Sequence, residues 1–181
     1  MAKLVSKVYG DALFSLALEE GKLDEIWDEV KVLEAALEEN KEFANIMAHP
    51  EMTQEKSLAL VDEAFKDKLS GIMMGFLQVL VKKGRFGEIL SVLDHFQRET
   101  KEYKKIGVVY VTTPTELTEE QKSDIVEKLT QTSGYESLEM NYIVDASILG
   151  GIRIRIGDRV VDNSIQTKLE DMTRSLSKVR V

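Results

Sequence analysis

The side chains that most often perform catalysis or bind metals are sparse in this chain. It contains two histidines, His49 and His95, and no cysteine. We expect His49, directly before Pro50, to lie in a loop, and His95 to lie at the rim of a helix. Without cysteine there is neither a disulfide framework nor a thiolate zinc site. These residue types predict no catalytic residue, no metal site and no cofactor.

Glycine motifs that bind phosphates or expose a nucleophile are also missing. The sequence has no GxxxxGK[ST], GxSxG or GxGxxG pattern. Gly150-Gly151 could suggest a phosphate cradle, but a predicted strand follows the pair, whereas anion binding needs a helix N-terminus. We interpret the pair as a bulge or a close approach of two backbones.

The charge and hydropathy of the chain exclude two further classes of protein. A formal net charge of −8 over 181 residues argues against nucleic-acid binding, which needs clustered Lys and Arg. The acidic groups form a solvated surface or, alternatively, meet basic segments of a partner. The most apolar window, Ile72–Val81, is far shorter than the roughly 20 residues of a membrane span. Any association with a membrane is therefore expected to go through a partner.

The pattern of apolar residues changes near Ile106 and predicts two domains in an α+β protein. Residues 1–105 show helical spacing, with short connections that favour a six-helix bundle. The stop and start signals are Gly21, Asn40, the N-cap Thr53 and Gly84. The expected helices are Val5–Glu20, Leu23–Glu39, Glu42–Ala48, a fourth after Thr53, Leu69–Lys83 and a sixth from about Phe86.

Residues 106–181 predict a small β-α-β-β-β-α domain. The first strand is Gly107–Thr113, and the next helix begins with the capping-box pattern Thr118-Glu-Glu-Gln121. Strands follow around Leu138–Val144 and from Ile152, and Gly157-Asp158 provides a hairpin turn.

The last predicted helix is amphipathic. Ser164 or Asp162 caps it, and it is expected to cover the sheet with a stripe of Ile165, Leu169, Met172, Leu176 and Val179. Arg153 and Arg155 project from one side of the strand before it. They form the polar outer face of the sheet or, alternatively, a patch for an acidic partner helix.

Two of the predicted helices are more apolar than a simple core stripe requires. The first has an expected core stripe of Val5, Val8, Tyr9, Ala12 and Leu16. It also carries Phe14 and Leu18 on another face. The fifth is apolar on nearly every side, so it is either central in the bundle or offers a surface to another protein. In the second case the two helices form a groove for an amphipathic partner helix, with adaptable methionine side chains.

Several motifs resemble one protein family along essentially the whole chain. They are Tyr9-Gly-Asp-Ala-Leu-Phe…Ala17, Phe43…Pro50, Thr113-Pro-Thr-Glu-Leu-Thr-Glu-Glu-Gln121 and Ile148-Leu-Gly-Gly-Ile-Arg-Ile-Arg-Ile-Gly-Asp-Arg-Val-Val-Asp-Asn-Ser-Ile…Leu169. The chain resembles the delta subunit of bacterial F-type ATP synthases, whose mitochondrial relative is the oligomycin-sensitivity-conferring subunit. Ala146 and Asn163 depart from the proline and glycine that are common in that family.

The resemblance implies a non-catalytic stator subunit, present once per complex at the cytoplasmic face of the membrane. It implies that residues 1–105 bind the N-terminal helix of an α subunit in a groove between the first and fifth helices. It also implies that residues 106–181 contact the b subunits of the peripheral stalk, with Arg153 and Arg155 as possible stalk-facing residues. The groove residues expected from the two apolar helices are Tyr9, Ala12, Leu13, Phe14, Ala17, Met73, Phe76, Leu77 and Leu80.

Two other classes of function remain open from the residues alone. One is a helical protein-interaction scaffold unrelated to ATP synthase. The other is an enzyme with an unrecognised site, which the lack of any convergent His, Cys or Ser arrangement disfavours.

Overall fold

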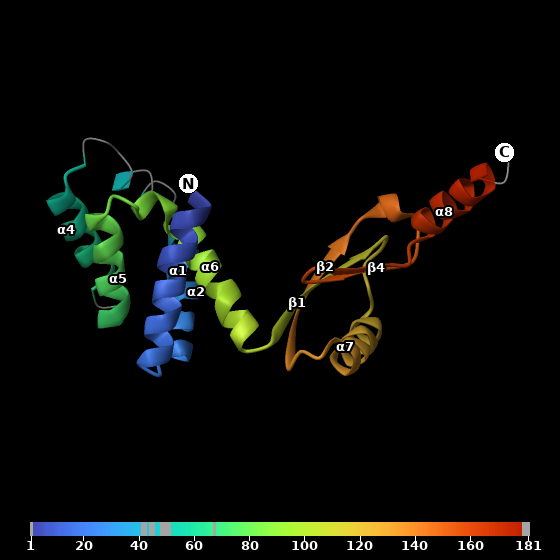
Figure 1. The fold of residues 1–181 in the computed structure, drawn as a ribbon, viewed down its shortest axis with the longest axis horizontal. Helices are drawn as coiled ribbons and strands as arrows, with labels where there is room; N and C mark the ends of the chain where they lie inside the picture. Colours follow the sequence, from blue (N-terminus) through green and yellow to red (C-terminus); the bar gives the residue numbers. More distant parts are fainter. Residues whose placement is uncertain (1, 41–42, 44–45, 48–51, 67, 179–181) are drawn as a thin grey trace. The chain divides into compact units, whose positions relative to one another are not determined.

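The computed structural model describes residues 2–40, 43, 46–47, 52–66 and 68–178. The chain forms two compact units, residues 1–100 and residues 101–181, and each is described by itself. The first consists of helices, and the second contains a four-stranded sheet with helices (Figure 1).

Five α-helices are described before the first strand. They are α1 (Ala2–Glu19), α2 (Leu23–Glu39), α4 (Gln54–Phe65), α5 (Gly71–Lys82) and α6 (Ile89–Tyr103), with a short 3-10 helix η1 (Phe86–Glu88) before the last. The third predicted helix, Glu42–Ala48, lies largely outside the described residues. The other five begin and end close to their predicted positions.

Local hydrogen bonds explain these boundaries. Thr53 is the N-cap of α4, because its side chain accepts a bond from the amide of Lys56. Gly21 and Gly84 follow α1 and α5 with φ of 65° and 64°, a conformation that costs glycine little. Helix α5 begins two residues later than predicted because Ser70 is its N-cap.

One hydrophobic core joins the helices of this unit. Buried residues of α1, α2, α4, α5, η1 and α6 belong to a single cluster. Phe43 packs edge-on against both Phe65 and Phe86, with ring centroids 5.8 and 6.1 Å apart. Glu29 accepts hydrogen bonds from the amide and hydroxyl of Ser70, at 2.8 and 2.9 Å, and so ties α2 to the start of α5. The unit therefore forms a hydrophobic core of its own without help from a partner.

The second unit has the predicted order β-α-β-β-β-α. Its elements are β1 (Ile106–Thr113), α7 (Glu119–Ser133), β2 (Ser137–Val144), the short helix η2 (Ala146–Ile148), β3 (Arg153–Ile156), β4 (Arg159–Asp162) and α8 (Ile165–Lys178). The strand order is β2-β1-β3-β4. The β1–β2 pair is parallel, and β3 is antiparallel to both β1 and β4.

Helix α7 lies along one side of this sheet (Figure 1). The predicted capping box is present, with Thr118 accepting from the amide of Gln121 and the Gln121 side chain accepting from the amide of Thr118. Gly134 ends the helix with φ 75°. On β1, Val109 and Val111 are fully buried. The hairpin between β3 and β4 turns at Gly157, which has the expected positive φ.

Gly150 and Gly151 allow a close approach of two chain segments, as expected. A Cβ at Gly151 would lie 2.4 Å from the carbonyl oxygen of Asn163, and φ at Gly151 is 81°. A Cβ at Gly150 would lie 2.6 Å from Cδ1 of Ile165. The carbonyl of Gly150 accepts a bond from the amide of Ile165. The pair therefore seats the start of α8 beside the loop that leads into β3.

Both predicted capping residues contribute to the start of α8. Asp162 accepts a 2.9 Å hydrogen bond from the amide of Ser164, and the hydroxyl of Ser164 accepts from the amide of Thr167. The same carboxylate pairs with Nε of Arg153 at 2.7 Å. These bonds, chiefly the one from the Ser164 amide, hold the pKa of Asp162 far below its ordinary value.

The expectation that the last helix covers the sheet is wrong. Ile165, Leu169 and Met172 of its apolar stripe are 47%, 51% and 62% exposed. Helix α8 contacts η2 and extends beyond the strands (Figure 1). Capping and periodicity predicted the helix correctly, but they do not say against what its apolar face packs.

Candidate partner-binding surfaces

The predicted core stripe of α1 is wrong in its phase. Val8, Ala12 and Leu16 were expected to be buried, but Val8 is 57% exposed and the other two are also exposed. The face that packs into the core is instead formed by Ser6, Gly10, Leu13 and Ala17. Helix α1 thus has two apolar faces, and a sequence pattern alone cannot tell which one is buried.

Helix α5 serves the core and the surface at once. Met73, Leu77 and Leu80 have no exposed surface. Phe76 is half-buried, and Val79 is 45% exposed. One side of this helix is therefore central in the bundle, and another side is accessible at the surface.

The nine predicted groove residues accordingly divide into two groups. Ala12 is exposed, and Tyr9, Phe14 and Phe76 are half-buried. The other five pack inside the unit and present no surface to a partner: Leu13, Ala17, Met73, Leu77 and Leu80.

Exposed apolar residues of the two helices that were not among the predicted groove residues are Leu4, Val8, Leu16, Leu18 and Val79. The excess of apolar residues on both helices was the only sequence signal for them. We define the α1/α5 face as Val8, Ala12, Leu16, Phe76 and Val79.

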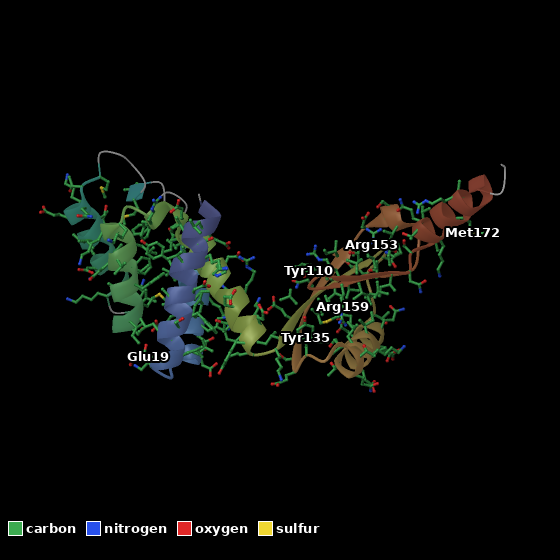
Figure 2. The ribbon with its side chains drawn as sticks, in the orientation of Figure 1. Glu19, Tyr110, Tyr135, Arg153, Arg159 and Met172 are labelled. Carbon is green, nitrogen blue, oxygen red and sulfur yellow. The ribbon has the colours of Figure 1, made fainter. Side chains whose placement is uncertain are left out.

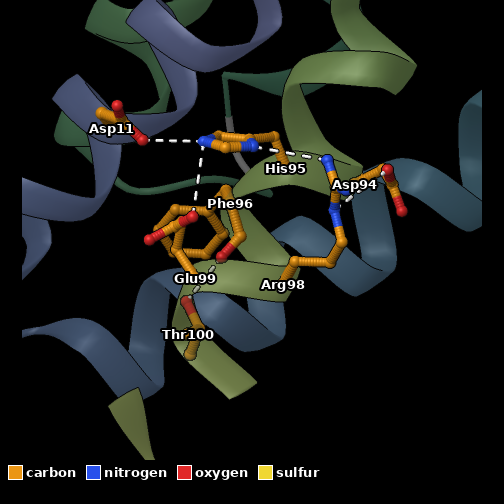
Figure 3. Close-up of polar contacts among 7 residues, drawn as sticks. All are labelled: Asp11, Asp94, His95, Phe96, Arg98, Glu99 and Thr100. Atoms are coloured by element: carbon orange, nitrogen blue, oxygen red, sulfur yellow. Dashed lines mark hydrogen bonds and ion pairs between the residues drawn. The ribbon is translucent and has the colours of Figure 1, made fainter. Parts of the chain in front are cut away.

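His95 is not a rim residue as expected, but is 9% exposed and lies between two carboxylates (Figure 3). Its Nε2 is 2.7 Å from Oδ1 of Asp11 and 3.7 Å from Oε1 of Glu99. On the other side of the ring, Arg98 lies 3.3 Å from Nδ1. Asp11 belongs to α1 and the other groups belong to α6, so this cluster links two helices.

The two predicted stalk-facing arginines have partners within the second unit. Arg153 pairs with Asp162 as described above, and the guanidinium of Arg155 lies 4.6 Å from the ring centroid of Tyr110. Figure 2 shows Tyr110 and Arg153 on the sheet. Both arginines therefore contribute to the internal structure of this unit. Its exposed apolar side chains lie on other residues.

Two apolar features of the second unit could contact a partner. One is the exposed stripe of α8, where Met172 lies well away from the strands (Figure 2). The other is a cleft of about 490 Å³ between α7 and the sheet. Leu129, Ile154 and Val161 line it, with Tyr135 and Arg159 (Figure 2). Surfaces of this kind are typical of protein interaction sites.

None of the helices described here combines the length and the hydrophobicity needed to cross a bilayer. Apolar helix faces of this kind are typical docking surfaces for amphipathic helices of other proteins.

Comparison with known proteins assigns the chain to a family. The family model for the ATP synthase delta (OSCP) subunit matches residues 5–176. This chain belongs to that family. The ATP synthase subunit delta of Lachnoclostridium phytofermentans is 48% identical over the full length of both chains. The corresponding protein of Brevibacillus brevis is 34% identical, over 94% of this chain and 97% of its own.

The fold is also found in a solved structure. A chain in the cryo-EM structure of the Toxoplasma gondii mitochondrial ATP synthase hexamer matches with a TM-score of 0.74 and 19% identity, covering 94% of this chain and 96% of its own. As a member of the delta family, this chain is a non-catalytic stator component that links the F1 part of ATP synthase to the peripheral stalk.

Proposed function

We propose that the α1/α5 face binds the N-terminal helix of an α subunit in the catalytic hexamer. The observation that carries this proposal is the exposure of apolar side chains on both helices of a unit whose core is already complete. An amphipathic helix laid on this face would cover Val8, Ala12, Leu16, Phe76 and Val79. Burying this area is the main favourable contribution to helix-in-groove binding.

Charge adds specificity at the edge of the α1/α5 face. Asp11 and Glu19 lie on α1 beside the apolar stripe, and Lys82 and Lys83 end α5. A partner helix with basic residues toward α1 and acidic residues toward the end of α5 would bind with complementary charge. Such charges raise the rate of association more than they raise the affinity.

We infer that residues 106–181 bind the ends of the b subunits of the peripheral stalk. The exposed stripe of α8 and the cleft beside α7 support this, because both need apolar groups to cover them. Arg153 and Arg155 then act indirectly, by holding Asp162 and Tyr110 in place.

Two contacts on one chain suit a stator component that must resist rotor torque. Once one interface has formed, the second forms at a high effective concentration, so neither needs extreme affinity alone. In this arrangement one copy per complex sits at the cytoplasmic face of the membrane, held there by the stalk. The resemblance of the whole chain to bacterial delta subunits supports this placement.

Isothermal calorimetry with a peptide from the N-terminal helix of the α subunit tests the first interface on the full chain. We expect Val79→Asp to weaken binding at least tenfold, because a charge would be buried against the peptide. Val32→Asp is the matched control, since Val32 is 61% exposed on α2, outside the α1/α5 face. Equal binding by both variants would exclude this face, and no binding by the parent chain would favour a scaffold with other partners.

A second experiment tests the stalk contact. Membranes stripped of this protein should regain coupled ATP synthesis on addition of the parent chain, and much less on addition of a Leu169→Asp/Met172→Asp variant. Direct binding of segments from the C-terminal ends of the b subunits to the two chains should show the same order. Full coupling with the double variant would remove α8 from the interface.

A further inference from the structure

Helix α1 raises a question of orientation. Its buried face, with Leu13 and Ala17, and its exposed face, with Val8, Ala12 and Leu16, are both apolar. The hydrophobic effect is not directional, so it favours burial of either face almost equally. Some other contact must select the rotation of α1 about its own axis.

The contact between α1 and α6 can select the rotation of α1, because the two helices fit closely there. At Gly10 the α1 backbone lies so near His95 that an added Cβ would be 2.5 Å from Cδ2 of the imidazole. Asp11, the next residue, pairs with Nε2 of the same ring at 2.7 Å. One turn on, Phe14 meets Phe96 edge-on, with centroids 6.4 Å apart.

The polar half of this contact has one consistent protonation pattern. A neutral imidazole satisfies both of its neighbours when Nε2 donates to Asp11 and Nδ1 accepts from the guanidinium of Arg98 (Figure 3). Asp11, His95 and Glu99 together could also hold a divalent cation, since their ligand atoms lie within 4.8 Å of one another. In this tautomer, however, the nitrogen that faces both carboxylates carries a proton instead of a free lone pair, so a hydrogen-bonded link fits the geometry better.

We propose that Gly10, Asp11 and His95 form a positioning contact that fixes the rotation of α1 and thereby presents Val8, Ala12 and Leu16 to a partner helix. The part of this proposal that concerns the partner rests on the proposed binding of the N-terminal helix of the α subunit. Neither Asp11 nor His95 needs to touch the partner. They act by excluding the other rotation of α1. In that rotation a side chain of α1, in place of the backbone at Gly10, would face the imidazole of His95.

A size-complementarity cycle tests the positioning role. Gly10→Ala places a methyl group against His95, whereas Gly75→Ala, in the middle of α5, meets nothing within 4 Å. We expect Gly75→Ala to raise the thermal midpoint of the full chain and Gly10→Ala to lower it. In a His95→Ala background the ring is gone, so adding Gly10→Ala should no longer lower the midpoint. Equal effects of Gly10→Ala in both backgrounds would overturn the proposal.

Thiol labelling measures the rotation without any partner. The chain has no cysteine, so Ala12→Cys and Ala17→Cys give matched single reporters on the exposed and buried faces. We expect the Ala12→Cys chain to react with an aromatic disulfide at least 100-fold faster than the Ala17→Cys chain. Adding Gly10→Ala should reduce this ratio at least tenfold. An unchanged ratio would show that another contact sets the rotation.

Peptide binding completes the test and separates the two proposals. Gly10→Ala should weaken binding of the peptide from the α subunit about tenfold in the parent chain and less than twofold in the His95→Ala background. If the parent chain binds no peptide, the proposed interface fails, while the labelling ratio still decides whether this contact orients α1. A changed ratio together with unchanged peptide affinity would overturn the link to the partner.

Discussion

The two units of this chain bury their apolar residues to very different extents. The first unites buried side chains from most of its helices in one cluster. Among the described residues of the second, the fully enclosed apolar side chains are Val109, Val111 and Ile148. Both units nevertheless expose an apolar helix face.

This difference separates two kinds of interaction surface. The first unit already has a complete core. Its stability therefore does not depend on a partner covering the α1/α5 face. The second unit leaves the stripe of α8 and the cleft beside α7 uncovered, so part of its apolar burial is expected to come only with a partner. Substitutions should therefore affect the free chain and the assembled complex differently in the two units.

The largest expected effect is in the core of the first unit. Leu77→Ala removes a fully buried side chain and should cost about 2–5 kcal/mol of unfolding free energy. Urea denaturation followed by the emission of Trp27, the only tryptophan, measures this unit alone. A cost below about 1 kcal/mol would show that the core is less closely packed than its burial indicates.

The next effect is dependent on pH and belongs to the second unit. Because the folded pKa of Asp162 lies below its unfolded value of about 3.9, its contribution to stability is present above that pH and declines as the pH falls below it. Asp162→Asn should therefore destabilise the second unit at pH 7, with the difference from the parent shrinking below about pH 4. Hydrogen exchange of peptides from β3 to α8, across this pH range, provides the measurement. A difference that stays constant down to pH 2 would mean that the charge of Asp162 is not responsible.

A moderate effect is expected at α7, the helix that lies along the sheet. Thr118→Ala removes half of the capping box and should cost about 1 kcal/mol of stability. Thr118→Ser, which keeps the hydroxyl, is the control and should remain close to the parent in hydrogen exchange of α7. Equal losses in the two variants would point to the methyl group of the threonine instead of the cap.

The smallest effect on the free chain is expected on α8. Leu169→Ala removes a side chain that is 51% exposed, so we expect the unfolding free energy to change by about 0.5 kcal/mol or less. The same substitution should weaken binding of segments from the b subunits severalfold. A large loss of stability in the free chain would contradict the contrast drawn between the two units.

Much of the fold could be predicted because its signals are local. Thr53, Gly84 and the Thr118–Gln121 box each mark a helix end through hydrogen bonds or positive φ within a few residues. The order of elements in the second unit followed from its alternating strands, the capping box and the Gly157-Asp158 turn. The start of α5 was misplaced although its cap is local: the Ser70 hydroxyl accepts from the amide of Met73, and Glu29 of α2 adds a second, distant partner.

The candidate site could be predicted only in part. The excess apolar content of α1 and α5 correctly indicated that these helices carry more than a core stripe. The choice of residues was less successful, because Leu13 and Leu77 are fully enclosed while Val8 and Val79 are exposed. His95 was misplaced for a related reason: its partner Asp11 is distant in sequence and adjacent only in the folded chain.

The sequence by itself determined the family, the two-part architecture, and the absence of cysteine and of nucleotide-binding motifs. These properties depend on residue types and short spacings, which folding does not alter. Only the tertiary structure decided which face of α1 is buried and whether α8 packs on the sheet. Each of those outcomes depends on which apolar surface finds a partner within the chain, and periodicity describes a helix face without naming what covers it.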